Sequence, residues 1–199
     1  MEKSSAGHNT FASASLMADF YLDSSARNHA FRVENYCMLL LSLPNIGKCF
    51  SPQDETLLLE ATLLHDVGHC VSAARHDTHS ELLIARELVG ENYSHKRINE
   101  LAGLAGSHRK KLSSRLSKHQ ECTKLAKLAS VLRFADGLDY IAFFNGFILS
   151  RIYLEKNQLH LAFKRCSADS YDSALKRLDD KAALFQKAFQ LSVKYNLVD

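Results

Sequence analysis

The sequence predicts an all-α protein with a small β-hairpin and a final helix near the C-terminus. Stretches rich in Leu and Ala place an apolar residue at every third or fourth position along most of the 199 residues, as amphipathic helices do. Two prolines and eight glycines interrupt them rarely. Between residues 147 and 163 apolar and polar residues instead alternate on both sides of Lys156-Asn157, which is typical of a hairpin.

Two helices are expected in the first 50 residues. The first is short and covers residues 13–22. Asp23 or Ser24 then caps a second helix that runs to about Leu43, because a side-chain oxygen at that position accepts a free N–H of the first turn. Residues 44–47, Pro-Asn-Ile-Gly, end it. Its apolar stripe consists of Ala26, Ala30, Val33, Cys37 and Leu40.

The next helix has a clear start and an unusual end. Ser51 is a capping residue, Pro52 suits the first turn, and the acids that follow favour the positive end of the helix dipole. The helix ends at His65-Asp66, and Gly68 is expected to close it as a C-terminal glycine. Beyond it we expect a polar loop over 69–78, helices over 79–89 and 94–106, a basic loop over 107–117, a long helix over 118–144, the hairpin, and a last helix over 169–195.

Length and composition indicate a single domain with an appendage. We expect a helical domain over residues 1–146 and a hairpin-helix appendage over 147–199 packed on it. The net charge of +3 supports no specific nucleic-acid partner, and no apolar stretch is long enough to span a membrane. The five cysteines are scattered without a C-x-x-C spacing, which favours reduced thiols in a cytoplasmic protein.

His65-Asp66 is the most informative pair of residues. It closes an almost wholly apolar run, residues 57–64. An imidazole and a carboxylate at the end of a buried helix are costly unless they meet a partner. A divalent metal ion fits both, because imidazole nitrogen and carboxylate oxygen are ordinary ligands of zinc, manganese and iron.

Asp136 is a candidate partner from a distant helix. Leu125, Ala129 and Leu132 precede it at helical spacing, so the carboxylate replaces an apolar residue on an inward face. A solvated Asp at a helix end is the alternative, given Gly137 beside it. Asp139, one turn later, is the rival carboxylate.

Three histidines complete the candidate set. His29 lies one turn before Val33, beside the core stripe, and a half-buried surface histidine is the alternative reading. His79 begins a predicted helix and His108 opens a basic loop, where plain polar residues are also common. His76 competes with His79.

The order His, His-Asp, His, His, Asp resembles the HD superfamily of metal-dependent phosphohydrolases. Residues 15–193 look like the C-terminal, HD-like half of the exopolyphosphatase and guanosine pentaphosphate phosphatase family, although this sequence lacks the actin-like ATPase-type domains that carry that family's catalysis. The pieces that carry the likeness are Asn28-His29, Leu64-His65-Asp66-Val67-Gly68, His79-Ser80 and Ser107-His108-Arg109-Lys110. The resemblance implies an HD-domain helical bundle and the metal ligands His29, His65, Asp66, His79, His108 and Asp136.

A metal-dependent phosphohydrolase acting on a nucleotide or other small phosphorylated compound is the leading hypothesis. One or two divalent ions (Mn, Mg, Fe, Zn or Ni) are its expected cofactor. The sequence leaves open whether two copies of the chain form a homodimer. Asp66 and His69 are the candidate catalytic residues, although a plain loop histidine is the alternative for His69. A non-catalytic module that binds phosphate, nucleotide or polyphosphate is the main alternative, and a di-iron oxygenase is a third. The candidate substrate-binding residues are Arg109, Lys110, Lys111 and Arg133. For the first three, a solvated basic loop is the alternative.

Overall fold

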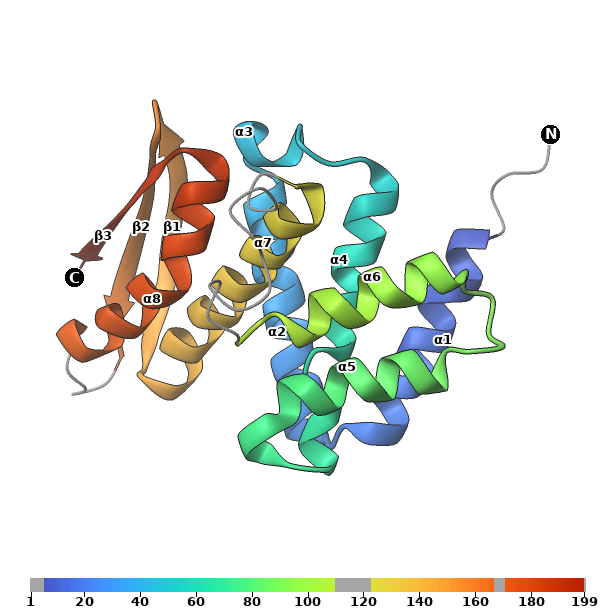
Figure 1. The fold of residues 1–199 in the computed structure, drawn as a ribbon. Coiled ribbons are helices and arrows are strands. Elements are labelled where there is room, and N and C mark those ends of the chain that lie inside the picture. Colours follow the sequence, from blue (N-terminus) through green and yellow to red (C-terminus); the bar gives the residue numbers. More distant parts are fainter. Residues whose placement is uncertain (1–5, 110–122, 167–170, 199) are drawn as a thin grey trace.

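A computed structural model describes residues 6–109, 123–166 and 171–198. Helices α1 to α7 form a bundle, and α8 with a small sheet lies at one end of it (Figure 1). The mainly helical fold predicted from the sequence is thus confirmed. The elements are α1 Ala6–Tyr21, α2 Ser24–Leu41, α3 Pro44–Gly47, α4 Pro52–Leu64, η1 Val67–Cys70, η2 Ala73–Arg75, α5 His76–Glu87, α6 His95–Gly106, α7 Lys124–Asp139, η4 Tyr140–Phe144, β1 Phe147–Glu155, β2 Gln158–Arg165, α8 Tyr171–Phe189 and β3 Ser192–Val198.

The predicted helix starts are confirmed by their caps. The Asp23 carboxylate accepts from the backbone N–H of Ala26 at the start of α2. Ser51 and Asp54 form a reciprocal capping box at the start of α4, and Ser94 caps α6. Each cap satisfies backbone donors that the first helical turn leaves free.

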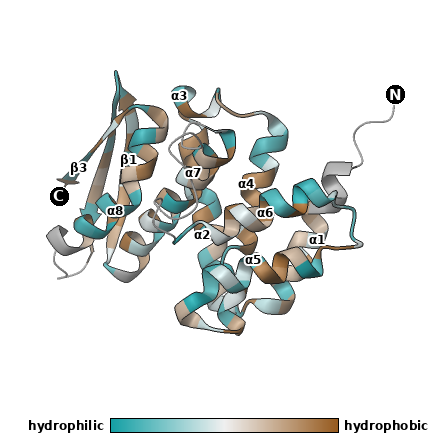
Figure 2. Ribbon diagram, in the orientation of Figure 1, coloured by the Kyte–Doolittle hydropathy of each residue, from teal (hydrophilic) through white to brown (hydrophobic). Residues whose placement is uncertain are grey.

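Helix α4 is the centre of the bundle. It contacts α1, α2, α6 and α7, and most of its side chains are buried around its whole circumference. Figure 2 shows hydrophobic positions along α4 and α7, where these helices face the interior. A helix that is apolar on all sides belongs in a core, which explains the continuous apolar run before His65.

The segment after α4 differs from the prediction. Two short 3₁₀ helices, η1 and η2, replace the polar loop, and α5 begins at His76 instead of His79. Gly68 lies inside η1 and does not cap α4 in a left-handed conformation. Its function is close packing, because a Cβ atom on Gly68 would lie 2.2 Å from the carbonyl oxygen of His76.

The C-terminal hairpin is confirmed, but the last helix ends earlier than predicted. β1 and β2 pair antiparallel, and β3 adds to β2 in parallel, so the sheet order is β1-β2-β3. α8 ends at Phe189, Gln190 adopts a φ of 53°, and Val193 and Tyr195 belong to β3. These apolar residues fit the helical period and the strand period equally, and pairing with β2 decides between them.

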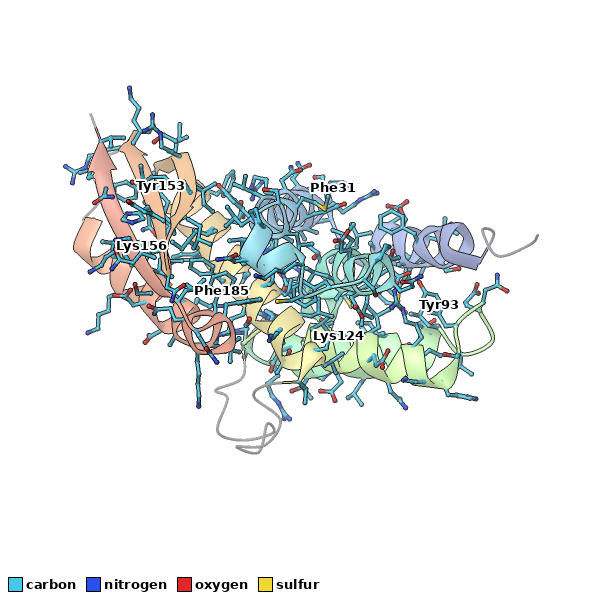
Figure 3. The ribbon with its side chains drawn as sticks, turned by 90° about the horizontal axis from the view of Figure 1, so that it is seen from above. Phe31, Tyr93, Lys124, Tyr153, Lys156 and Phe185 are labelled. Atoms are coloured by element: carbon cyan, nitrogen blue, oxygen red, sulfur yellow. The ribbon has the colours of Figure 1, made fainter. Side chains whose placement is uncertain are left out.

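Helix α8 attaches the sheet to the bundle. The rings of Phe134 on α7 and Phe185 on α8 lie 4.8 Å apart, and Figure 3 shows Phe185 where α8 meets the bundle. The division into residues 1–146 and 147–199 stays a prediction. No helix in the described residues is long and apolar enough to cross a membrane.

Candidate metal centre

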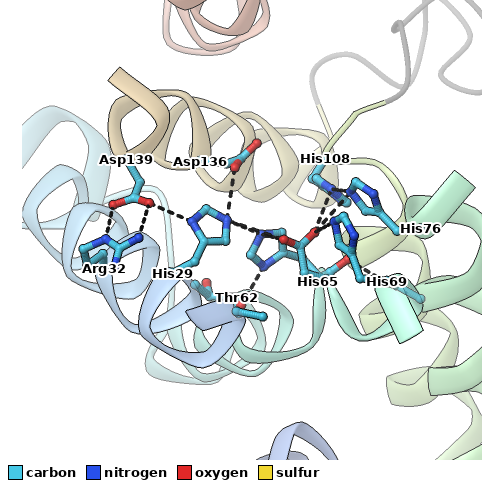
Figure 4. A network of polar contacts seen from close by, with 12 residues as sticks. His29, Arg32, Thr62, His65, His69, His76, His108, Asp136 and Asp139 are labelled. Carbon is cyan, nitrogen blue, oxygen red and sulfur yellow. Dashed lines mark hydrogen bonds and ion pairs between the residues drawn. The ribbon is translucent and has the colours of Figure 1, made fainter. Parts of the chain in front are cut away.

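Four helices of the bundle bring four histidines around one carboxylate. His29 comes from α2, His65 and Asp66 follow α4, His76 begins α5, and His108 follows α6. All four rings point their Nε2 atoms toward Asp66 (Figure 4). The members of this cluster are spread between residues 29 and 108 of the sequence, so the tertiary fold brings them together.

Three of these rings are held through Nδ1 by a backbone carbonyl three residues earlier. His65 donates to Thr62 O at 2.8 Å, and the corresponding bonds of the other two rings measure 2.8 Å (His76 to Ala73) and 2.6 Å (His108 to Ala105). A carbonyl oxygen only accepts, so Nδ1 carries the hydrogen in each ring. Each Nε2 then presents a lone pair to the centre whenever its ring is neutral.

His29 is held by a carboxylate. Its Nδ1 lies 2.7 Å from Oδ2 of Asp139, and Arg32 binds both oxygens of Asp139 at 2.7 and 3.1 Å. Burial raises the pKa of the fully buried Asp139, but the bonds from His29 and Arg32 outweigh it and lower the pKa. Asp139, the rival of Asp136, therefore orients a histidine from behind and does not face the centre.

The histidines form two pairs on opposite oxygens of Asp66. His29 and His65 each place Nε2 3.6 Å from Oδ2, and their own Nε2 atoms are 3.2 Å apart. His76 and His108 place Nε2 3.2 and 3.5 Å from Oδ1 and are 3.0 Å apart. Asp66 thus lies between two groups of nitrogen ligands.

A cation is needed in each pair. Two neutral rings whose Nδ1 atoms carry the hydrogens would oppose their lone pairs at 3.0 to 3.2 Å. A proton relieves this: burial lowers the pKa of His29, but Asp136 and Asp139 raise it to about 10. The carboxylate of Asp66 likewise raises the pKa of His76 against burial, whereas burial lowers the pKa of His108 to about 3. A proton or a metal ion between the two nitrogens of a pair would relieve this opposition.

The donor set fits divalent metal ions. Two nitrogens bound at about 2.1 Å to one ion lie about 3.0 Å apart at a right angle and about 3.4 Å apart at the tetrahedral angle. The observed separations of 3.0 and 3.2 Å agree. Among the described residues, Oδ1 of Asp66 is buried and accepts no hydrogen bond, as expected of an oxygen meant for a metal. Imidazole-rich sites suit Zn, Fe or Ni better than Mg.

Asp136 adds a second carboxylate to the His29 side. Its Oδ1 lies 3.4 Å from Nε2 of His29, and its Oδ2 bonds Nζ of Lys181 at 2.6 Å. Burial raises the pKa of Asp136, but Lys181 and His29 hold it well below the usual range. Asp136 is therefore an anion at neutral pH with one oxygen toward the centre.

His79 is not brought into the cluster. It is half-buried on α5 and its side chain lies beside Gly68, whereas His76 occupies the position next to Asp66 and His108. His76, the competitor of His79, takes this position because α5 begins three residues before the predicted start. The repeated contact of Nδ1 with the carbonyl three residues earlier, which His76 shares with His65 and His108, is visible only in the structure.

His69 lies at the edge of the centre. Its ring stacks on that of His76 with centroids 3.8 Å apart, and its Nε2 is 3.8 Å from Oδ1 of Asp66. The side chain is 41% exposed, and burial lowers its pKa. His69 is thus open to a ligand in the adjoining cleft.

A cleft of about 800 Å³ opens over the centre. Its lining includes His29, Asp66, His76 and Asp136 together with positively charged side chains. Lys110 and Lys111 lie outside the described residues. The contribution of α8 to this cleft had no signal in the sequence, because its residues follow the predicted ligands by more than 40 positions. The positively charged residues of the lining are Arg32, Arg109, Arg133, Arg177 and Lys181.

Comparison with protein families identifies the chain. The family described as Ppx/GppA phosphatase, domain III, matches residues 12–140. That range covers more than half of the 199 residues, so the chain belongs to this family. A comparison with curated proteins gives no match. The matched range includes every histidine and aspartate of the centre and ends before β1, β2, α8 and β3.

Proposed function

We propose that the protein is a metal-dependent phosphohydrolase of the HD type that acts on a nucleotide or other small phosphorylated compound. One observation carries the proposal: two pairs of imidazole Nε2 atoms lie on opposite oxygens of the single carboxylate of Asp66. A carboxylate placed in this way would be available to ions held by either pair. The family relation to a phosphatase supports phosphate as the group acted on.

The residues divide into two ligand sets that share Asp66. His29, His65 and Asp136 would hold one ion, and His76 and His108 would hold the other. Bound divalent ions lower the pKa of a coordinated water and polarise a phosphoryl oxygen. Asp139 keeps His29 in the tautomer that presents Nε2, and the Thr62 carbonyl does the same for His65.

The cleft supplies the charge that a phosphorylated compound needs. Arg109 reaches over η2, where its Nη1 lies 3.4 Å from Ala73 O and 3.2 Å from Nδ1 of His76. Arg133 and Arg177 line the same cleft. Guanidinium groups bind phosphate oxygens through paired N–H donors and neutralise their charge. His69, which is open to the cleft beside Asp66, is placed to exchange a proton at Nε2 with a bound compound.

Metal analysis joined to a phosphate-release screen tests this function. Protein purified without chelator is expected to contain up to two ions per chain and to release phosphate from at least one of a set of nucleotides, polyphosphate and simple monoesters. Asp66→Asn is expected to lose both properties, and Asp179→Asn, an exposed carboxylate on α8, to keep them. Phosphate release that survives in Asp66→Asn would refute the site.

A non-catalytic binding module is the second candidate. The matched family is domain III of a phosphatase, which is one part of a larger protein. The arginines that line the cleft would serve a phosphorylated ligand in either case. Metal-loaded wild-type protein that binds polyphosphate or a nucleotide in a titration, but releases no phosphate from any of them, would favour this candidate.

A further inference from the structure

We infer that Lys181 is a positioning residue of the metal centre, so that helix α8 completes a site whose ligands all lie in the family-matched range. This inference rests on the metal binding proposed above. Lys181 is placed to fix Asp136 in the orientation that turns one oxygen toward His29. It also contacts the backbone of His108, which belongs to the other histidine pair.

The contacts of Lys181 define this function. Nζ lies 2.6 Å from Oδ2 of Asp136 and 3.4 Å from the carbonyl oxygen of His108. A carboxylate turns about a single bond, so fixing Oδ2 also fixes Oδ1, which lies 3.4 Å from Nε2 of His29. Lys181 therefore orients Asp136 in the same way that Asp139 orients His29: each bonds the atom of its partner that faces away from the centre.

The packing of α8 on α7 shows that this approach is built into the fold. Residue 137, next to Asp136, is glycine, and a Cβ atom there would lie 3.0 Å from Cβ of Lys181 and 3.1 Å from Cδ1 of Leu178. The contact between Phe134 and Phe185 holds the two helices together on the same side. α8 is thus seated where the lysine stem, which is 25% exposed, reaches the carboxylate.

Whether the loss of Lys181 weakens or strengthens metal binding distinguishes a lysine that positions a ligand from one that only adds positive charge. A lysine that contributed only its positive charge would repel a bound cation, so its removal would tighten metal binding. A lysine that orients a ligand makes binding stronger, and its loss weakens binding. Removing a partner that orients a metal ligand typically costs ten- to a hundredfold in affinity. We expect positioning to dominate because Lys181 bonds the carboxylate oxygen opposite to the one that faces His29.

The test is a calorimetric titration of the full chain with Mn²⁺ and with Zn²⁺. Lys181→Met is expected to bind the ion about tenfold more weakly than wild type. Lys181→Arg, which keeps a donor for Oδ2, is expected to recover most of that loss. Lys176→Met, an exposed lysine on the same helix, is the control and is expected to match wild type. Melting curves in chelator show whether the variants are folded at the titration temperature.

Unchanged or tighter binding by Lys181→Met would overturn the inference. If that variant does not fold, the same titration of Lys181→Gln decides: weaker binding supports positioning, and binding at or above the wild-type affinity refutes it. A wild-type chain that binds neither ion would overturn the metal centre itself. If the wild type binds metal and Lys181→Met binds it with the same affinity, only the inference about Lys181 fails and the metal centre stands.

Discussion

The orientation of the histidines depends on backbone groups at helix ends. The last carbonyls of an α-helix have no intrahelical partner. Thr62, near the end of α4, and Ala105, near the end of α6, use such carbonyls to accept Nδ1–H from His65 and His108. One bond satisfies the carbonyl and aims the opposite nitrogen at the centre, which makes helix C-termini suitable places for metal-binding histidines.

His76 and His79 provide a direct test of the ligand assignment. His76→Ala is expected to reduce bound metal by one ion per chain, because it removes one of the two imidazoles beside Oδ1 of Asp66. His79→Ala is expected to keep the wild-type metal content, because its ring is outside the cluster. Elemental analysis of both variants measures the difference. The opposite pattern would restore His79 as the ligand.

The buried thiol of Cys37 predicts a dependence of stability on alkaline pH. Burial raises the pKa of Cys37 to about 12, whereas an unperturbed thiol titrates near about 8.5. A group whose pKa is raised on folding stabilises the protein fully below the unfolded pKa and loses that contribution as the pH rises through the folded value. The free energy of unfolding of wild type is therefore expected to fall more steeply between about pH 8.5 and about 12 than that of Cys37→Ala.

Denaturant unfolding at several pH values measures both slopes. Alkylation at pH 8 is an independent check, since the exposed thiols of Cys70 and Cys166 should react in the native protein and Cys37 only after unfolding. Equal slopes for the two proteins would refute the assigned pKa.

The start of α5 depends on one close backbone approach. A Cβ atom on Gly68 would lie 2.2 Å from His76 O and 2.4 Å from Ser80 N. Ser80 Oγ joins the same elements, since it accepts from Gly68 N–H at 2.9 Å and donates to His65 O at 2.7 Å. The position of His76 beside Asp66 therefore follows from this contact.

Gly68→Ala is expected to destabilise the protein by at least about 1–3 kcal/mol, the usual cost of overpacking a well-packed interior. Gly103→Ala on α6 is the control: nothing lies within 4 Å of its Cβ position, and alanine there is expected to gain about 0.5–1 kcal/mol. Thermal or denaturant unfolding measures both changes. Equal stability of Gly68→Ala and wild type would contradict the close contact.

A buried ion pair joins α6 to α4. Glu60 is fully buried, and Arg97 bonds its Oε2 at 2.8 Å while Tyr93 donates to Oε1 at 3.3 Å. Breaking a buried pair from one side leaves a charge without compensation and costs several kcal/mol. The 20% exposure of Arg97 reduces that cost.

Glu60→Gln is expected to lower the free energy of unfolding by about 3 kcal/mol, the lower end of the range for a broken buried pair. Glu100→Gln breaks the exposed pair that Lys96 and Glu100 form within α6, and it is expected to cost about 0.5 kcal/mol or less. Urea unfolding of the two variants compares them. Similar losses would show that burial does not set the strength of the Glu60 pair.

At the scale of the whole molecule, the proposed metal centre connects segments from residue 29 to residue 181. Side chains from α2 and α7, with residues at the ends of α4 and α6, meet around Asp66, and Lys181 adds α8. An ion bound there exists only in the folded chain, so metal binding is linked to folding. The metal should therefore stabilise the whole molecule instead of one helix.

Metal at a hundred times its dissociation constant is expected to stabilise the protein by about 2.7 kcal/mol for one site. The melting temperature should rise on addition of metal and fall with chelator. Asp66→Asn should show neither change, because it removes the carboxylate shared by both ligand sets. A metal-induced rise of the same size in Asp66→Asn would place the ion elsewhere.

The amino-acid sequence alone was enough to predict the helical class, the caps at Asp23 and Ser51, and the hairpin around Lys156. These features depend on local physics: a capping oxygen, a helical or alternating period, and a turn act within a few residues. The same local pattern made Asp136 a candidate, since it is one carboxylate on an apolar stripe, but the preference for it over a solvated aspartate came from the family resemblance.

Tertiary structure decided the features that depend on distant partners. β3 formed because β2 offers a strand edge to residues with two possible periods. His76 rather than His79 reached Asp66 because Gly68 lets α5 begin early and close to α4. Lys181 joined the centre because glycine at 137 lets α8 approach α7. In each case the deciding contact joins elements far apart in the chain, and no local pattern of residues records it.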